Sequence, residues 1–168
     1  MNKHDDAQID ETPSEEASIG DTQPQSSRSA RKGKYALDNQ VGFVLRKAQQ
    51  RHLNIFAAHM DENLTAQQFA ALAKLAEVGP SSQNSLGRQT AMDNSTINGV
   101  VTRLHDRGLI EKQPLPEDRR MIQIQLTPEG ERTIARVIPM AQEITRMTLA
   151  PLSRSEQATL IRLLRRIT

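Results

Sequence analysis

The stretch DNSTINGVVTRLHDRGLIEKQPLPEDRRMIQIQLTPEG, residues 93–130, carries a helix signal followed directly by a hairpin signal. Asp93 is a residue type that caps helices, and apolar side chains then recur at helical spacing until Gly108. These apolar positions are Ile97, Val100, Val101 and Leu104. After Gly108 the apolar residues change to a spacing of two on either side of a polar turn, which is typical of a β-hairpin. The stretch therefore predicts a helix near residues 94–107 and a hairpin whose tip spans residues 115–120.

Two further helical segments precede this stretch. Thr65 with Gln68 three residues later forms a capping-box signature, and the helix that it begins should end at Gly79 and Pro80. A short segment around residues 86–90 then meets the next helix at a tight turn. This is the order of a helix-turn-helix followed by a wing. We expect a mainly α fold with a small β-hairpin wing, that is, a winged helix-turn-helix.

The outer parts of the chain predict dimerisation helices and a disordered tail. Residues 1–36 have few large apolar side chains, so we expect a disordered tail that either adds solubility or touches DNA phosphates with its basic end. We expect the winged helix-turn-helix core at about 62–127 within a domain that spans 37–168. The helices at about 37–61 and 128–168 have apolar faces that so small a core cannot cover. These terminal helices should therefore form a homodimer interface.

Polar side chains on the outward face of the helix near 94–107 are candidate DNA contacts. Asn pairs with adenine edges, hydroxyl groups reach bases or phosphates, and the Thr methyl group can meet thymine. Free N–H groups at the start of the helix could also meet phosphate. The candidates on this helix are Asn94, Ser95, Thr96, Asn98, Thr102 and Arg103.

The hairpin tip provides a second set of candidates, Asp118, Arg119 and Arg120. An arginine at such a tip fits the narrow, electronegative minor groove, and an acid two residues earlier can orient its guanidinium group. An isolated turn of this composition is more often simply solvated. Its position after a predicted helix-turn-helix makes duplex DNA the expected partner.

The sequence resembles the MarR family of winged helix regulators over residues 37–168. The resemblance rests on an acid, a spacer and an arginine at Asp118 to Arg120, on the strand end Leu126-Thr127 followed by Gly130, and on the stretches LTAQQF (64–69) and DNSTINGVVTRLHDRGLIEK (93–112). It implies a homodimer that binds a near-palindromic operator and is released by a small aromatic acid. One departure is Ala91, where the family commonly has Gly in the turn, so Ala91 either avoids the left-handed conformation or is strained in it.

Residues of the first helix are candidates for binding that small acid. His52 and His59 interrupt its apolar face, and Arg46 and Arg51 lie nearby in the sequence, while Phe69 on the second helix could face an aromatic ring. Two interpretations remain open: the histidines bind an anionic ligand, or they are core residues bonded to a neighbouring group. The run RHLNIFAAHM (51–60) resembles repressors of nicotinate breakdown within the family, which implies an aromatic carboxylate such as a hydroxynicotinate. A zinc site is disfavoured, because the two histidines lack a third evident ligand.

Composition and missing motifs narrow the class of protein. The 168-residue chain has a net charge of +2 and no Cys, which excludes a disulfide and a thiolate metal site. No segment has the apolar length of a membrane span or the pattern of a secretory signal, so we expect a cytoplasmic protein without a membrane partner. No nucleophile motif, phosphate loop or cofactor signature is evident, so we do not expect an enzyme. A winged helix that binds protein without ligand control is the alternative.

Overall fold

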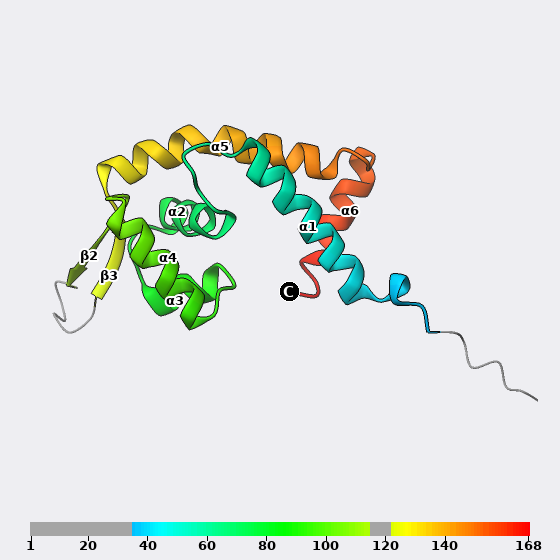
Figure 1. Cartoon of the computed structure of the whole chain (residues 1–168), viewed down its shortest axis with the longest axis horizontal. Helices are drawn as coiled ribbons and strands as arrows, with labels where there is room; N and C mark the ends of the chain where they lie inside the picture. The colour runs from blue at the N-terminus through cyan, green and yellow to red at the C-terminus, as the bar shows by residue number, and fades with distance from the viewer. Residues whose placement is uncertain (1–34, 115–121) are drawn as a thin grey trace, which may run out of the picture. The chain divides into compact units, whose positions relative to one another are not determined.

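The computed structural model describes residues 35–114 and 122–168. Residues from Ala36 to Thr168 form one compact unit, drawn in Figure 1. The predicted tail, apart from its last two residues, and the predicted wing tip lie outside the described residues. The elements are η1 (Leu37–Asn39), α1 (Val41–His59), α2 (Ala66–Val78), β1 (Ser81–Ser82), α3 (Gln83–Gln89), α4 (Asn94–Asp106), β2 (Ile110–Pro114), β3 (Ile122–Leu126), α5 (Pro128–Leu149) and α6 (Arg154–Leu164).

The helix starts follow the capping residues that the sequence contains. Thr65 and Gln68 form a reciprocal capping box at the start of α2, with the Gln68 N–H donating to the Thr65 hydroxyl oxygen at 3.2 Å. Asp93 caps α4, and Thr127 caps α5 directly before Pro128. Each cap accepts from a backbone N–H group that has no partner inside the helix. These starts confirm the beginnings predicted for α2, α4 and α5, whereas the first α-helix begins at Val41 rather than at about residue 37.

The hydrophobic core lies between α2, α3, α4, α5 and the sheet. Its fully buried members include Leu72 on α2, Leu86 on α3, Leu104 on α4 and Ile124 on β3. All four apolar positions predicted for the inner face of α4 have no exposed surface. The prediction of a winged helix-turn-helix with a β-hairpin is confirmed.

The sheet has one strand more than the hairpin predicted from the sequence. Its strand order is β1-β3-β2, and both pairings are antiparallel. The additional strand β1 consists of Ser81 and Ser82, which pair with Ile124 and Gln123. Two serines have no alternation of apolar and polar residues, so no pattern of period two could reveal this strand.

The turn of the helix-turn-helix places Ala91 in the left-handed region, with φ 53°. Ala91 is therefore a residue in a conformation that commonly requires Gly, and the alternative that it avoids this conformation is wrong. The turn closes tightly, because the Met92 N–H donates to the Gly87 carbonyl at 2.9 Å. A Cβ on Gly87 would lie 3.2 Å from the Met92 carbonyl oxygen, so the glycine permits this approach.

Large apolar side chains remain exposed on the outer helices. Val41, Val44 and Leu45 on α1 are 68%, 50% and 40% exposed, and Ile161 and Leu163 on α6 are 38% and 45% exposed. These side chains belong to the faces for which the sequence predicts a dimer interface. Among the described residues, no helix has the length and apolar character to cross a membrane.

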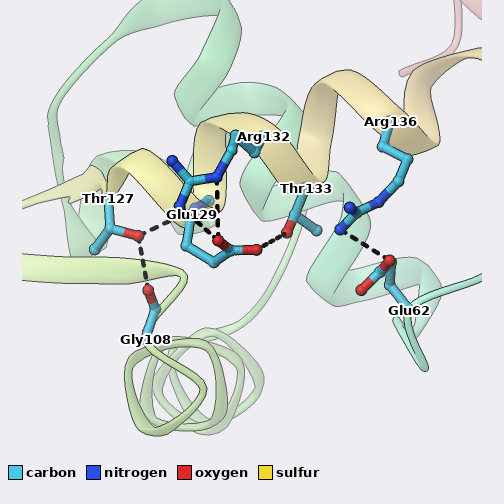
Figure 2. Close-up of polar contacts among 8 residues, drawn as sticks. Glu62, Gly108, Thr127, Glu129, Arg132, Thr133 and Arg136 are labelled. Carbon is cyan, nitrogen blue, oxygen red and sulfur yellow. Dashed lines mark hydrogen bonds and ion pairs between the residues drawn. The ribbon is translucent and has the colours of Figure 1, made fainter.

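The end of α4 is joined to the start of α5 by a compact set of hydrogen bonds around Thr127 (Figure 2). The Thr127 hydroxyl donates to the Gly108 carbonyl at 2.7 Å and accepts from the Gly130 N–H at 3.0 Å. The Thr127 N–H donates to the Leu109 carbonyl at 3.2 Å. Gly130 lies so close to this carbonyl group that a Cβ on Gly130 would overlap the Leu109 oxygen. The glycine therefore sets how closely α5 approaches the turn after α4.

We predict that Gly130→Ala lowers the free energy of unfolding. The added methyl group must push α5 away from the Leu109 carbonyl group, and overpacking of this kind costs about 1–3 kcal/mol. Urea unfolding at fixed protein concentration measures the change. Gly42→Ala on α1 is the matched control, because a Cβ there meets nothing within 4 Å and should leave stability unchanged or raise it. Equal stability of the wild type and the Gly130 variant would contradict this account.

Candidate nucleic-acid interface

The outward face of α4 is polar and exposed along its length. Ser95, Asn98 and Thr102 lie on this face, opposite the buried apolar face, and all three are exposed. The Thr102 hydroxyl donates to the Asn98 carbonyl at 3.0 Å, so its proton is already used within the helix. Thr102 can therefore offer an acceptor and its methyl group to a partner, whereas Asn98 can offer a donor and an acceptor.

The start of α4 is occupied by its own cap. Asp93 accepts from the Thr96 N–H at 2.7 Å and from the Thr96 hydroxyl at 3.0 Å. These two hydrogen bonds lower the pKa of Asp93, because they stabilise its ionised form. The Thr96 N–H is therefore engaged by a carboxylate, and of the three predicted residues at this end Asn94 and Ser95 are the exposed ones.

Arg103 lies against the glycine one turn before it on α4. Its Nη2 atom is 3.3 Å from the point at which a Cβ on Gly99 would stand. Gly99 thus makes room for the guanidinium group beside the polar face. The other predicted cationic contacts, Arg119 and Arg120, lie with Asp118 outside the described residues, beyond the ends of β2 and β3 at Pro114 and Ile122.

His52, the main candidate for binding an aromatic acid, bridges α1 and α5. Its Nδ1 atom lies 3.0 Å from the Thr148 hydroxyl oxygen, and the Thr148 hydroxyl donates to the Ile144 carbonyl at 2.8 Å. Because that hydroxyl proton is used, the histidine donates from Nδ1 to Thr148. Its Nε2 atom is then the acceptor of the neutral ring. The sequence indicated His52, but nothing in it indicated Thr148 as its partner.

Three rings link this histidine to the second helix. The ring centroids of His52 and Phe56 are 6.4 Å apart, and those of Phe56 and Phe69 are 5.9 Å apart. Arg51 is exposed and donates to the Met147 carbonyl at 3.2 Å, so it also reaches α5. The structure therefore brings the predicted residues His52, Phe69 and Arg51 to the region where α1 contacts α2 and α5.

The other two predicted ligand residues, Arg46 and His59, are exposed on α1. The hydrogen bond from Arg146 lowers the pKa of Glu143 on α5, and a smaller electrostatic contribution to this lowering comes from His59. Open pockets of about 530 Å³, between α2, β3 and α5, and about 480 Å³, between α1, α2 and the turn before α4, lie among the same helices. Neither is lined by any of the five predicted ligand residues.

Comparison with known proteins identifies relatives of this chain. The model of the MarR family matches residues 64–122. The transcriptional repressor NicR of Pseudomonas putida is 40% identical over 134 residues, which cover 79% of this chain and 85% of that protein.

Two solved structures resemble the chain over a similar length. A probable transcriptional regulator from Pseudomonas aeruginosa is 48% identical with a TM-score of 0.77, and the match covers 79% of this chain and 100% of that one. BpsR of Bordetella bronchiseptica is 38% identical with a TM-score of 0.77. That match covers 80% of this chain and 97% of BpsR. Its structure concerns the regulation of its DNA binding by 6-hydroxynicotinic acid. The chain therefore belongs to the MarR family, as a transcriptional regulator and not an enzyme.

Proposed function

We propose that this protein is a dimeric repressor that binds a near-palindromic operator and releases it when a small aromatic carboxylate binds. The observation that carries the proposal is the two-sided character of α4, with a buried apolar stripe that anchors it and an exposed face of Ser95, Asn98 and Thr102. In a winged helix-turn-helix this helix is the one that enters the major groove. Arg119 and Arg120 on the wing would add contacts in the flanking minor groove, oriented by Asp118.

The dimer part of the proposal rests on the exposed apolar side chains of α1 and α6. A second copy would cover them through an isologous interface that involves the terminal helices at about 37–61 and 128–168. Two copies related by a twofold axis would place two α4 helices on one face of the duplex. The operator should therefore repeat its half-sites in inverted orientation, and the protein would act at the chromosome in the cytoplasm.

The effector part rests on the region around His52 and on two relatives. 6-Hydroxynicotinic acid regulates the DNA binding of BpsR, and NicR is a transcriptional repressor. A carboxylate could be bound by the imidazole ring of His52 and by Arg51, with Phe69 close to an aromatic ring. Arg46 and His59 extend the positive charge along α1. We propose a hydroxynicotinate-like acid as the effector.

We predict that duplexes selected from a random library by the purified protein share a near palindrome. Half-sites should be centred roughly 10 base pairs apart, because the two α4 helices of a dimer would enter the major groove one helical turn apart. Sequencing of the retained duplexes and a footprint on the best one measure the symmetry. Selected sites without twofold symmetry would contradict the dimeric mode of binding. A protein that retains no duplex would support the alternative of a module that binds protein.

We predict that Asn98→Ala reduces discrimination between the selected operator and a duplex altered in both half-sites. Loss of an amide that reads a base edge costs about 1–3 kcal/mol of discrimination. Titration of both duplexes at one salt concentration gives the ratio of affinities. Asn54→Ala is the matched control, because it removes an exposed amide from α1. Equal loss on both duplexes would instead assign Asn98 to a phosphate contact.

We predict that His52→Ala leaves operator affinity intact and abolishes its response to 6-hydroxynicotinic acid. By linkage, the effector and the operator weaken each other's binding by the same factor, typically about 5-fold to 150-fold. Calorimetry with 6-hydroxynicotinic acid, nicotinate, salicylate and urate defines the ligand class. Thr148→Val, which retains His52 but removes the partner of its Nδ1 atom together with the hydroxyl bond to the Ile144 carbonyl, should weaken the response without abolishing it. A normal response in the His52 variant would make the histidine structural.

A further inference from the structure

The turn between α1 and α2 contains two successive residues with left-handed backbones that are not glycine. Glu62 has φ 65° and Asn63 has φ 50°. Such a conformation is unfavourable for an L-residue and persists where surrounding contacts hold it. The contacts that hold this turn come from two arginines on other elements.

Arg107 at the end of α4 holds the backbone of the turn. Its Nη2 atom donates to the Glu62 carbonyl at 2.6 Å, and its Nη1 atom donates to the Asn63 carbonyl at 3.4 Å. A guanidinium group presents donors in a fixed fork, so two neighbouring carbonyl oxygens define its orientation. Arg107 is also the C-cap of α4, and its position is tied to that of the helix.

Arg136 on α5 holds the side chain of the same turn. Its Nη2 atom lies 2.9 Å from the Glu62 carboxylate oxygen, as Figure 2 shows. Both side chains are partly exposed, 51% for Arg136 and 32% for Glu62. An exposed ion pair of this kind contributes little to stability. We therefore consider how the Arg136–Glu62 pair affects the position of the turn relative to α5, rather than its contribution to the free energy of unfolding.

Together these contacts close a ring around the base of α4. From Arg107 the ring passes through the Glu62–Asn63 turn to Arg136, and along α5 back to Gly130. It closes through Thr127, which bonds Gly108 and Leu109 directly after Arg107. Two separate attachments join the end of α4 to α5, one through the Thr127 junction and one through the turn. The packing of its buried apolar face already holds α4 in the core, and the two attachments add restraints at its C-terminal end.

We infer that Arg107 and Arg136 are positioning residues that, through the Glu62–Asn63 turn, fix the direction of α4 relative to α5. This inference rests on the proposed function, in which α4 reads the operator and α5 belongs to the dimerisation and effector region. The ring would keep the two reading helices of a dimer at the spacing that the operator requires. Neither arginine needs to touch DNA for this role.

We predict that breaking the ring weakens operator binding without unfolding the protein. Arg107→Ala should raise the operator Kd by roughly 10-fold, because it removes two hydrogen bonds from a charged donor. Glu62→Gln and Arg136→Gln should each raise it by roughly 2-fold to 5-fold. The double variant should lose no more affinity than either single variant, because both substitutions break the same ion pair. Arg136→Lys, which retains the charge, should recover part of the affinity.

Matched controls separate this role from a general effect of charge. Arg132→Gln removes the same charge one turn earlier on α5, where Arg132, among the residues that the structure describes, pairs within its own helix with Glu129 at 2.7 Å. It should leave operator affinity unchanged. Glu77→Gln, which removes an acid paired within α2 to Lys74, is the control for Glu62. Equal losses in these controls and in the ring variants would overturn the inference.

The salt dependence of binding separates positioning from phosphate contact. If Arg107 binds a phosphate, its removal should lower the logarithmic salt slope by about 1 per subunit. If it positions α4, the slope stays unchanged while the affinity falls. A lowered slope would therefore assign Arg107 to the DNA backbone and overturn its role in the ring.

A measurement without DNA distinguishes failure of this inference from failure of the proposed function. The chain has no Cys, so Ser95→Cys on α4 and Gln142→Cys on α5 provide two defined sites for spin labels. In labelled protein diluted with unlabelled protein, the distance distribution should be narrow in the wild-type background and broader with Arg107→Ala or Glu62→Gln. Unchanged distributions would overturn the inference even if the wild type binds its operator. If the distributions broaden as expected but the protein is found to bind no duplex, the proposed function alone would be overturned.

Discussion

The approach of Gly130 to the Leu109 carbonyl group is the contact on which the arrangement of the other elements depends. It brings the start of α5 against the turn that follows α4, and no side chain fits between them. Thr127 completes the junction because its hydroxyl group serves both Gly108 and Gly130, while its N–H serves Leu109. One residue thus ends β3, caps α5 and holds the end of α4. The strands β2 and β3, the helix α4 and the long helix α5 all meet at this point.

The division of α4 into two faces separates the side chains that build the core from those proposed to contact DNA. Its inner apolar side chains have no exposed surface, and burying each such side chain contributes about 1.5–3 kcal/mol. The outer residues Ser95, Asn98 and Thr102 contribute little to this core. Substitutions on the outer face should therefore leave the fold intact while they change the contacts proposed for DNA. This independence is the physical reason that the variants on this face test recognition rather than stability.

The contact between α1 and α5 combines polar and aromatic groups where the rest of the core is aliphatic. His52 donates to Thr148, and its ring lies beside Phe56, which in turn lies beside Phe69. A half-buried imidazole with one nitrogen engaged retains a second nitrogen for another partner. Exposed apolar side chains also lie on α1, at Val41, Val44 and Leu45. The proposed effector region and the proposed dimer interface therefore share α1, so a ligand in one could shift the other.

The sequence by itself determined the features that arise within a few residues of one another. The caps at Thr65, Asp93 and Thr127, the inner face of α4 and the hairpin all follow from local hydrogen bonds and from the periodicity of helices and strands. Only the tertiary structure decided the features that join distant segments. The strand β1 exists because β3 lies beside it, Ala91 is left-handed because a tight turn overrides its preference, and His52 meets Thr148 across 96 residues of chain. Arg107 meets the Glu62–Asn63 turn in the same way, since the free energy of such contacts depends on packing that no local pattern encodes.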